Sequence, residues 1–141
     1  MSLGSIINVG AGSRGTSYVA FTGKVDVNLG TGNGGYTAVG RVILQGRDLI
    51  GRDVDLIASI RCINSSTTGS LLLYDVTDGD LLLSDNTITS TVANDLDVTL
   101  SALPRTGERI LELRAGLAPG PSYVDSDGFT VFFASLRIRE L

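Results

Sequence analysis

The 141 residues suit one domain with a sizeable core, and a hydrophobic content of 43% is typical of a globular chain rather than a disordered one. The formal net charge is −4, so we expect no nucleic-acid partner and no anionic membrane surface as a partner. No histidine and a single cysteine exclude histidine-containing catalytic triads, most zinc sites and an internal disulfide. No apolar run approaches the roughly 18 residues of a membrane helix, and the first residues lack the pattern of a signal peptide.

The N-terminal segment is rich in glycine: ten of the 18 glycines fall in the first 40 residues. Residues 1–16 show no clear hydrophobic period, which predicts a flexible arm followed by a folded domain over residues 17–141. Gly10–Gly15 matches the G-x-G-x-x-G pattern of dinucleotide sites. That site requires a helix after the last glycine, however, and the residues that follow are β-prone. We therefore expect no cofactor.

From residue 17 onward the chain is a series of short β-type runs separated by turn residues. Asp78-Gly79 predicts a tight hairpin turn, and we expect at most one turn of helix, between residues 44 and 56. Many short strands without long helices predict an all-β fold, a single antiparallel β-sandwich of jelly-roll type, with a small barrel as the alternative. The expected strands are Ser17–Thr22, Lys24–Leu29, Tyr36–Leu44, Val54–Ile63, Ser70–Tyr74, Asp80–Leu83, Thr87–Val92, Leu96–Leu103, Arg109–Ala115 and Phe129–Arg139.

Alternation of apolar residues predicts which strand faces form the core. The expected core residues are Leu56, Ile60, Leu73, Leu113 and Leu136. Cys62 continues the apolar face of its strand, so we interpret it as a buried thiol, with a reactive thiol as the alternative.

The last expected strand is apolar on both faces at its start and cationic at its end. Such a strand needs cover on both faces, which either a central position in the sandwich or another subunit would provide. One face carries Thr130, Phe132, Ala134, Leu136 and Ile138, and the other carries Phe129, Val131, Phe133, Ser135, Arg137 and Arg139.

Two further patterns concern ligands. The carboxylates of Asp75, Asp78 and Asp80 surround a turn glycine, a pattern that leaves calcium open, although a hairpin turn alone also explains it. Tyr36 and Tyr123 adjoin loops and are the candidate ligand-binding aromatics, since a tyrosine ring can stack on a sugar. With no histidine and only three glutamates, we expect no enzyme and assign no catalytic, cofactor or metal residue.

The second half of the chain resembles a β-sandwich domain of tailed-bacteriophage virion proteins. Leu72–Gly79 is similar to the hairpin of those domains, Glu112–Ala115 to a later strand, and Phe133–Ile138 to the closing strand. The resemblance covers residues 70–141, consists of residue types and marks no catalytic residue. Such domains serve as capsid decoration (cement) proteins, head fibres, or baseplate and tail parts.

A short chain with one sandwich and a glycine-rich arm looks most like a decoration protein. The resemblance implies a homotrimer that stabilises a phage head by binding the major capsid protein on the virion surface, after synthesis in the host cytoplasm. The alternative is a carbohydrate- or receptor-binding module of a phage tail or fibre. The candidate assembly residues are Phe129, Val131, Phe133, Arg137, Arg139 and, in the arm, Arg14.

Overall fold

The computed structural model describes residues 15–28, 36–62, 68–89, 91–117 and 128–140, which form nine strands and one short 3-10 helix. Among these residues no helix is long and apolar enough to cross a membrane. The elements are β1 (Thr16–Thr22), β2 (Val25–Asn28), β3 (Tyr36–Gln45), η1 (Gly46–Leu49), β4 (Arg52–Cys62), β5 (Gly69–Asp75), β6 (Asp80–Ile88), β7 (Asn94–Thr99), β8 (Glu108–Leu117) and β9 (Gly128–Glu140).

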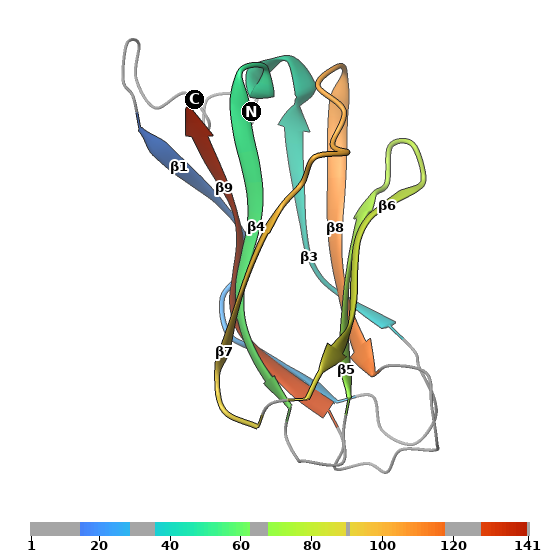
Figure 1. The fold of residues 1–141 in the computed structure, drawn as a ribbon. Helices are drawn as coiled ribbons and strands as arrows, with labels where there is room; N and C mark the ends of the chain where they lie inside the picture. Colours follow the sequence, from blue (N-terminus) through green and yellow to red (C-terminus); the bar gives the residue numbers. More distant parts are fainter. Residues whose placement is uncertain (1–14, 29–35, 63–67, 90, 118–127, 141) are drawn as a thin grey trace.

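Two antiparallel sheets face each other and form a sandwich (Figure 1). The first, here named the β9 sheet, has the order β1-β9-β4-β7, and β2 also pairs with β9. The second, here named the β8 sheet, has the order β3-β8-β5-β6. The predicted all-β sandwich is therefore confirmed.

The strand order is that of a jelly roll. β1 and β2 pair with successive parts of β9, so together they act as one interrupted first strand. This first strand pairs with the last strand, β9, and the next strands pair in the same nested way: β3 with β8, β4 with β7 and β5 with β6. Such nested antiparallel pairs, divided between two sheets, form the two Greek keys of a jelly roll. The topology thus brings the C-terminal strand between β1 and β4, at the centre of the β9 sheet.

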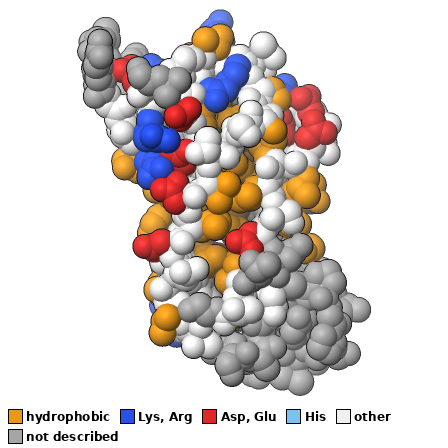
Figure 2. All heavy atoms as spheres, viewed as in Figure 1, with side chains coloured by type: hydrophobic (Ala, Val, Ile, Leu, Met, Phe, Trp, Pro, Cys, Tyr) orange, Lys and Arg blue, Asp and Glu red, His pale blue; other side chains and the backbone are white. Residues whose placement is uncertain are grey.

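The core lies between the two sheets, where hydrophobic side chains are visible as a band in Figure 2. The five predicted core residues are all buried, with exposed fractions of at most 1%, so the predicted faces of their strands are confirmed. Cys62 is also fully buried, and its Sγ donates a hydrogen bond to the carbonyl oxygen of Ile88 at 2.9 Å. Burial raises the pKa of this thiol, which is the environment of an unreactive cysteine.

Two glycines meet geometric demands that a side chain would violate. Gly79 has a φ of 76° and closes the hairpin between β5 and β6, as the sequence predicted for Asp78-Gly79. At Gly40 a Cβ would collide with the backbone carbonyl of Phe21, at the place where β3 of one sheet packs against β1 of the other. The absence of a side chain there lets the two sheets meet along this side of the sandwich.

The structure differs from two of the predicted strands. Residues 80–83, expected as one strand, and Thr87 and Ile88, expected to begin another, lie in the single strand β6. The strand expected at Leu96–Leu103 is observed as β7, Asn94–Thr99. A register shift between Gly69 and Leu71 of the partner strand β5 accommodates the polar residues in the middle of β6. Local alternation does not distinguish an irregular strand from two separate ones.

Candidate interaction surface

Sequence analysis pointed to β9 as the strand that contacts a partner, and the structure places several of its side chains on the solvent side of the β9 sheet. Phe133 and Tyr18 are 41% and 56% exposed there, beside the arginines that follow Phe133 along the strand. Positive and negative side chains gather on this side of the molecule, at the upper left of Figure 2. We call it the outer face. Its residues are Tyr18 and Ala20 of β1, Asp53, Asp55, Ile57 and Ser59 of β4, Asp95, Asp97 and Thr99 of β7, and Phe133, Ser135, Arg137 and Arg139 of β9.

One predicted assembly residue lies elsewhere: Val131 is fully buried in the core. The cause is a β-bulge in β9, where Phe133 pairs with Ser59 while Val131 pairs with the next residue, Ile60. Phe132 is therefore an extra residue, and the inward and outward positions exchange beyond it. The side chain of Phe129, together with Arg14 and Tyr123, lies outside the described residues.

The upper half of the outer face is organised around Asp55, whose side chain is fully buried although it points away from the core. The Nε atoms of Arg137 and Arg139 donate to its Oδ2 at 3.0 and 2.8 Å, and the Thr99 hydroxyl donates to its Oδ1 at 2.8 Å. Arg137 also binds both carboxylate oxygens of Asp97 at 2.9 Å. The two arginines, expected from sequence to pair with another subunit, are thus bound to acids of their own chain.

These contacts decide the charge state of Asp55. Burial by itself raises the pKa of a carboxyl group, but the hydrogen bonds from Arg139, Thr99 and Arg137 favour the ionised form and lower the pKa of Asp55 to about 2. Asp55 is therefore ionised throughout the physiological range. A fixed, compensated charge of this kind orders the face rather than transferring protons.

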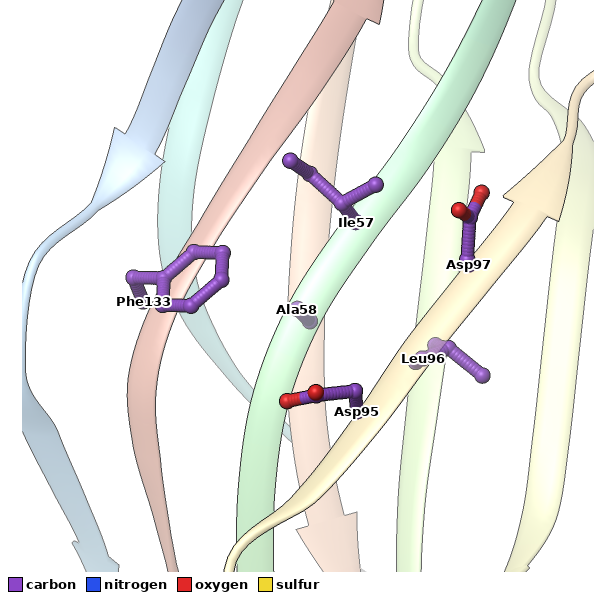
Figure 3. Close-up of a pocket in the computed structure, with 6 residues that line it drawn as sticks. All are labelled: Ile57, Ala58, Asp95, Leu96, Asp97 and Phe133. Atoms are coloured by element: carbon purple, nitrogen blue, oxygen red, sulfur yellow. The ribbon is translucent and has the colours of Figure 1, made fainter.

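The lower half of the outer face contains an open hollow of about 270 Å³, shown in Figure 3. Phe133 and Ile57 form its apolar part, and Asp95 and Asp97 line the side formed by β7. The Phe133 ring and the Asp95 carboxylate extend toward each other across β4 in Figure 3. Ala58 and Leu96 complete the lining. The hollow therefore combines an accessible aromatic ring with two carboxylates.

The β8 sheet also has a charged outer side, built around Glu112. Arg41 and Arg114 donate to its Oε2 at 3.1 and 3.2 Å, and both arginines lower the pKa of the carboxyl against the raising effect of burial. The Arg114 guanidinium lies 4.2 Å from the ring centre of Tyr74, which is cation–π geometry. Aromatic and charged groups here bind each other.

Tyr36, the other candidate aromatic within the described residues, begins β3 and belongs to the β8 sheet. Its hydroxyl lies 3.2 Å from the Ser70 hydroxyl, and the residue is 37% exposed. Tyr36 therefore lies on a different sheet from Phe133. The structure does not bring this candidate ligand-binding residue together with the candidate assembly residues.

Two of the aspartates in the β5–β6 hairpin, Asp75 and Asp78, have protein partners. Asp75 Oδ1 accepts hydrogen bonds from the backbone N–H groups of Thr77 and Asp78, and Arg109 donates to Asp75 and Asp78 at 3.0 and 2.6 Å. A guanidinium thus lies between the two carboxylates that a cation would need. Within the described part of the chain, no group of three acidic, histidine or cysteine side chains is arranged to hold a metal ion.

Sequence reasoning missed part of the outer face, namely Ile57, Asp95, Asp97 and Tyr18. Ile57 falls on the non-core face of its strand, to which the sequence analysis gave no role, and Asp97 of β7 lies 40 residues from its partner Arg137 on β9. A useful signal was the apolar residue Ile57 between Asp55 and Ser59, since an apolar side chain on a solvent face often marks a contact.

Comparison with known proteins shows similarity in fold only. No protein-family model and no curated protein sequence matches the chain. Among solved structures, the VP2 subviral particle of infectious bursal disease virus is similar at a TM-score of 0.60 and 10% identity, over 89% of this chain and 32% of that one. A protein of the T13 particle of the same virus matches with a TM-score of 0.55 and 12% identity, over 91% of this chain and 32% of that one. The CBM36-1 domain of a multidomain xylanase from the hindgut metagenome of Trinervitermes trinervoides gives 0.50 at 11%, over 90% and 98%.

These neighbours differ in size and in what their names describe. The chain spans about a third of the length of the viral proteins and nearly all of the xylanase domain. At 10–12% identity the similarity establishes the architecture. The chain is therefore a jelly-roll β-sandwich of a kind found both in a viral capsid protein and in one domain of a multidomain xylanase.

Proposed function

We propose that this protein is a structural virion component, a decoration protein that binds major capsid subunits on a phage head. The observation that carries the proposal is the outer face, where exposed Phe133 and Tyr18 lie beside a network of ionised groups that holds its shape. Aromatic residues and arginine are enriched at protein interfaces, and a face with preformed side-chain positions loses less entropy on binding. The shared fold with a viral capsid protein and the resemblance to phage virion domains support the same role.

We propose further that the protein is not an enzyme. The chain has no histidine, and the buried carboxylates of Asp55, Asp75 and Glu112 are each bound by arginine. A general acid or base needs a pKa near the working pH, whereas the arginines keep Asp55 and Glu112 ionised. These groups suit a role in holding structure.

A homotrimer is the assembly that we propose for this role. A protein that stabilises a shell gains from contacting several subunits at once, because linked contacts raise avidity without strong single contacts. Closed symmetry presents identical faces to equivalent neighbours. Light scattering on the purified protein tests this part, and a strictly monomeric species at high concentration would contradict it.

Co-sedimentation with capsids tests the proposed function directly. Capsids assembled from the major capsid protein of the same genome should bring the protein into the pellet with a saturable stoichiometry. Capsids already saturated with unlabelled protein serve as the control and should take up no labelled protein. Absence of binding to undecorated capsids would contradict the decoration role.

A carbohydrate-binding module of a tail or fibre is the second candidate, and the hollow is the observation that favours it. Phe133 offers a ring for stacking on a sugar, and Asp95 and Asp97 can accept hydrogen bonds from hydroxyl groups. A glycan array distinguishes the candidates, because a module of this kind should bind a defined set of glycans that a decoration protein ignores.

A further inference from the structure

We infer that the hollow beside Phe133 is the docking site for an arginine side chain presented by a partner protein. The inference rests on the proposed assembly role, since it names the side chain by which the partner docks. It begins from Phe133, whose ring is exposed on the same side of β9 as Arg137 and Arg139, while the bulge at Phe132 takes Val131 into the core. The result is an exposed aromatic ring on a central strand of a sheet, next to an irregularity of a kind often found at functional sites.

The hydrogen-bonding character of the hollow limits what can bind there. Its polar side chains are Asp95 and Asp97, whose ionised carboxylates only accept hydrogen bonds. The backbone groups of β4, which form the floor of the hollow, pair with β7 on one side and with β9 on the other. A guanidinium only donates hydrogen bonds, so it matches a site lined by acceptors, whereas a sugar hydroxyl also needs donors.

The charges of the hollow point the same way. Asp97 already binds Arg137, with its carboxylate still 55% exposed, while Asp95 is exposed and has no ion-pair partner among the described residues. A cation entering the hollow would therefore meet the carboxylate of Asp95, unpaired within the described residues, and the carboxylate of Asp97, whose charge Arg137 partly balances. On the opposite side of the hollow lies the Phe133 ring, which in Figure 3 points an edge toward Asp95 and turns a face to the viewer. A guanidinium stacks favourably on such an open ring face.

The size of the hollow fits a single side chain. Pockets for small molecules usually span roughly 300–1,000 Å³, and 270 Å³ falls just below that range. Ile57 and Phe133 provide apolar contact for the methylene stem of an arginine, and Asp95 lines the same hollow, where it can bind the charged end. Arginine is also among the residues that most often dominate the binding energy of a protein interface.

Chemical-shift mapping with a small probe tests the inference without a capsid. Acetyl-arginine-amide added to the ¹⁵N-labelled full chain should shift the amide signals of Ile57, Leu96 and Phe133 in a saturable way. Acetyl-citrulline-amide has nearly the same shape but no charge, and at matched ionic strength it should leave these signals in place. Equal shifts with both probes would overturn the inference.

Two matched variants sharpen this test. Asp95→Asn should weaken binding of acetyl-arginine-amide about fivefold, the loss expected for one exposed ion pair. Asp80→Asn makes the same charge change at an exposed residue of β6 on the other sheet and should leave the affinity unchanged. Equal affinities of the two variants would overturn the inference, as would shifts at the same residues with xylotriose but none with the arginine probe.

The titration and the capsid assay can fail separately. Binding of the arginine probe without binding to capsids would contradict the decoration role and leave the docking site standing. Capsid binding that Asp95→Asn leaves unchanged, with no response to the arginine probe, would remove the docking site and leave the decoration role standing.

Discussion

The solvent-facing sides of the two sheets each carry a carboxylate that is bound by two arginines, but the two sides differ in the aromatic residue beside it. On the β9 sheet Asp55 is shared by Arg137 and Arg139, and on the β8 sheet Glu112 is shared by Arg41 and Arg114. In both cases a carboxylate on a central strand lies almost out of solvent because arginine covers it.

The difference lies in the neighbouring aromatic residue. On the β8 sheet the arginine that binds Glu112 also covers Tyr74, so charge and ring are both occupied. On the β9 sheet Arg137 and Arg139 bind aspartates, and the Phe133 ring stays open beside the hollow. The ring next to the Glu112 network is thus covered, while the ring next to the Asp55 network is free on a rigid support, as expected of a side that meets a partner.

The largest effect should come from the core that both sides share. Leu113→Ala removes a fully buried side chain from β8 and should lower the free energy of unfolding by about 2–5 kcal/mol. Leu81→Ala, at a residue 48% exposed on β6, is the control and should cost less than about 1 kcal/mol. Urea unfolding measures both. Similar losses for the two variants would mean that the strand faces are wrongly assigned.

The next effect distinguishes the two charge networks. Asp55→Asn leaves two guanidinium groups without their carboxylate and should cost about 2–3 kcal/mol at pH 7. Glu112→Gln should cost only about 1 kcal/mol, because Arg41 and Arg114 are 55% and 36% exposed and water compensates them. A larger loss for Glu112→Gln would reverse the view that the β9 sheet has the more rigid support.

The dependence of stability on pH should show the same network. The pKa of Asp55 is about 2 in the folded protein against an ordinary value of 3.8, so the folded state binds its proton less readily. The stabilisation is complete above about pH 4 and is lost as the pH falls toward 2, for a total of about 2 kcal/mol. Between pH 7 and pH 2, the free energy of unfolding should therefore fall more steeply at acid pH for the natural protein than for Asp55→Asn. Identical curves would contradict the assigned pKa.

The contrast between the two sides also marks the limit of sequence reasoning. Alternation identified the apolar faces of β4, β5 and β8, because each of those patterns is local. It could not pair Asp55 with Arg137 and Arg139, which lie more than 80 residues away and meet only through the jelly-roll order of strands.

The bulge at Phe132 is the second limit. Side chains of a strand alternate between core and solvent, so the direction of one residue predicts the direction of all the others. One extra residue reverses this prediction for the residues beyond it. The assignment was correct for Ala134, Leu136 and Ile138, and wrong for Val131. The hollow joins Phe133 of β9 to Asp95 and Asp97 of β7, and local alternation does not indicate which strands become neighbours.

The smallest effect on stability should accompany a large effect on binding. Phe133→Thr keeps a residue that favours strands and removes a ring that is partly in water, so the free energy of unfolding should fall by only about 1 kcal/mol. Tyr74→Thr is the matched change on the β8 sheet. It should cost about 2 kcal/mol, because that ring is less exposed and Arg114 packs on it.

Capsid co-sedimentation supplies the second measurement. Phe133→Thr should abolish or strongly reduce capsid binding, while Tyr74→Thr should bind like the natural protein once folded. If instead Phe133→Thr is the more destabilised variant, its ring contributes mainly to packing and the hollow is not an open contact surface. Normal capsid binding by Phe133→Thr would move the interface away from the outer face, because an exposed ring in a hollow beside a charge network is the feature that marks this side of the sandwich.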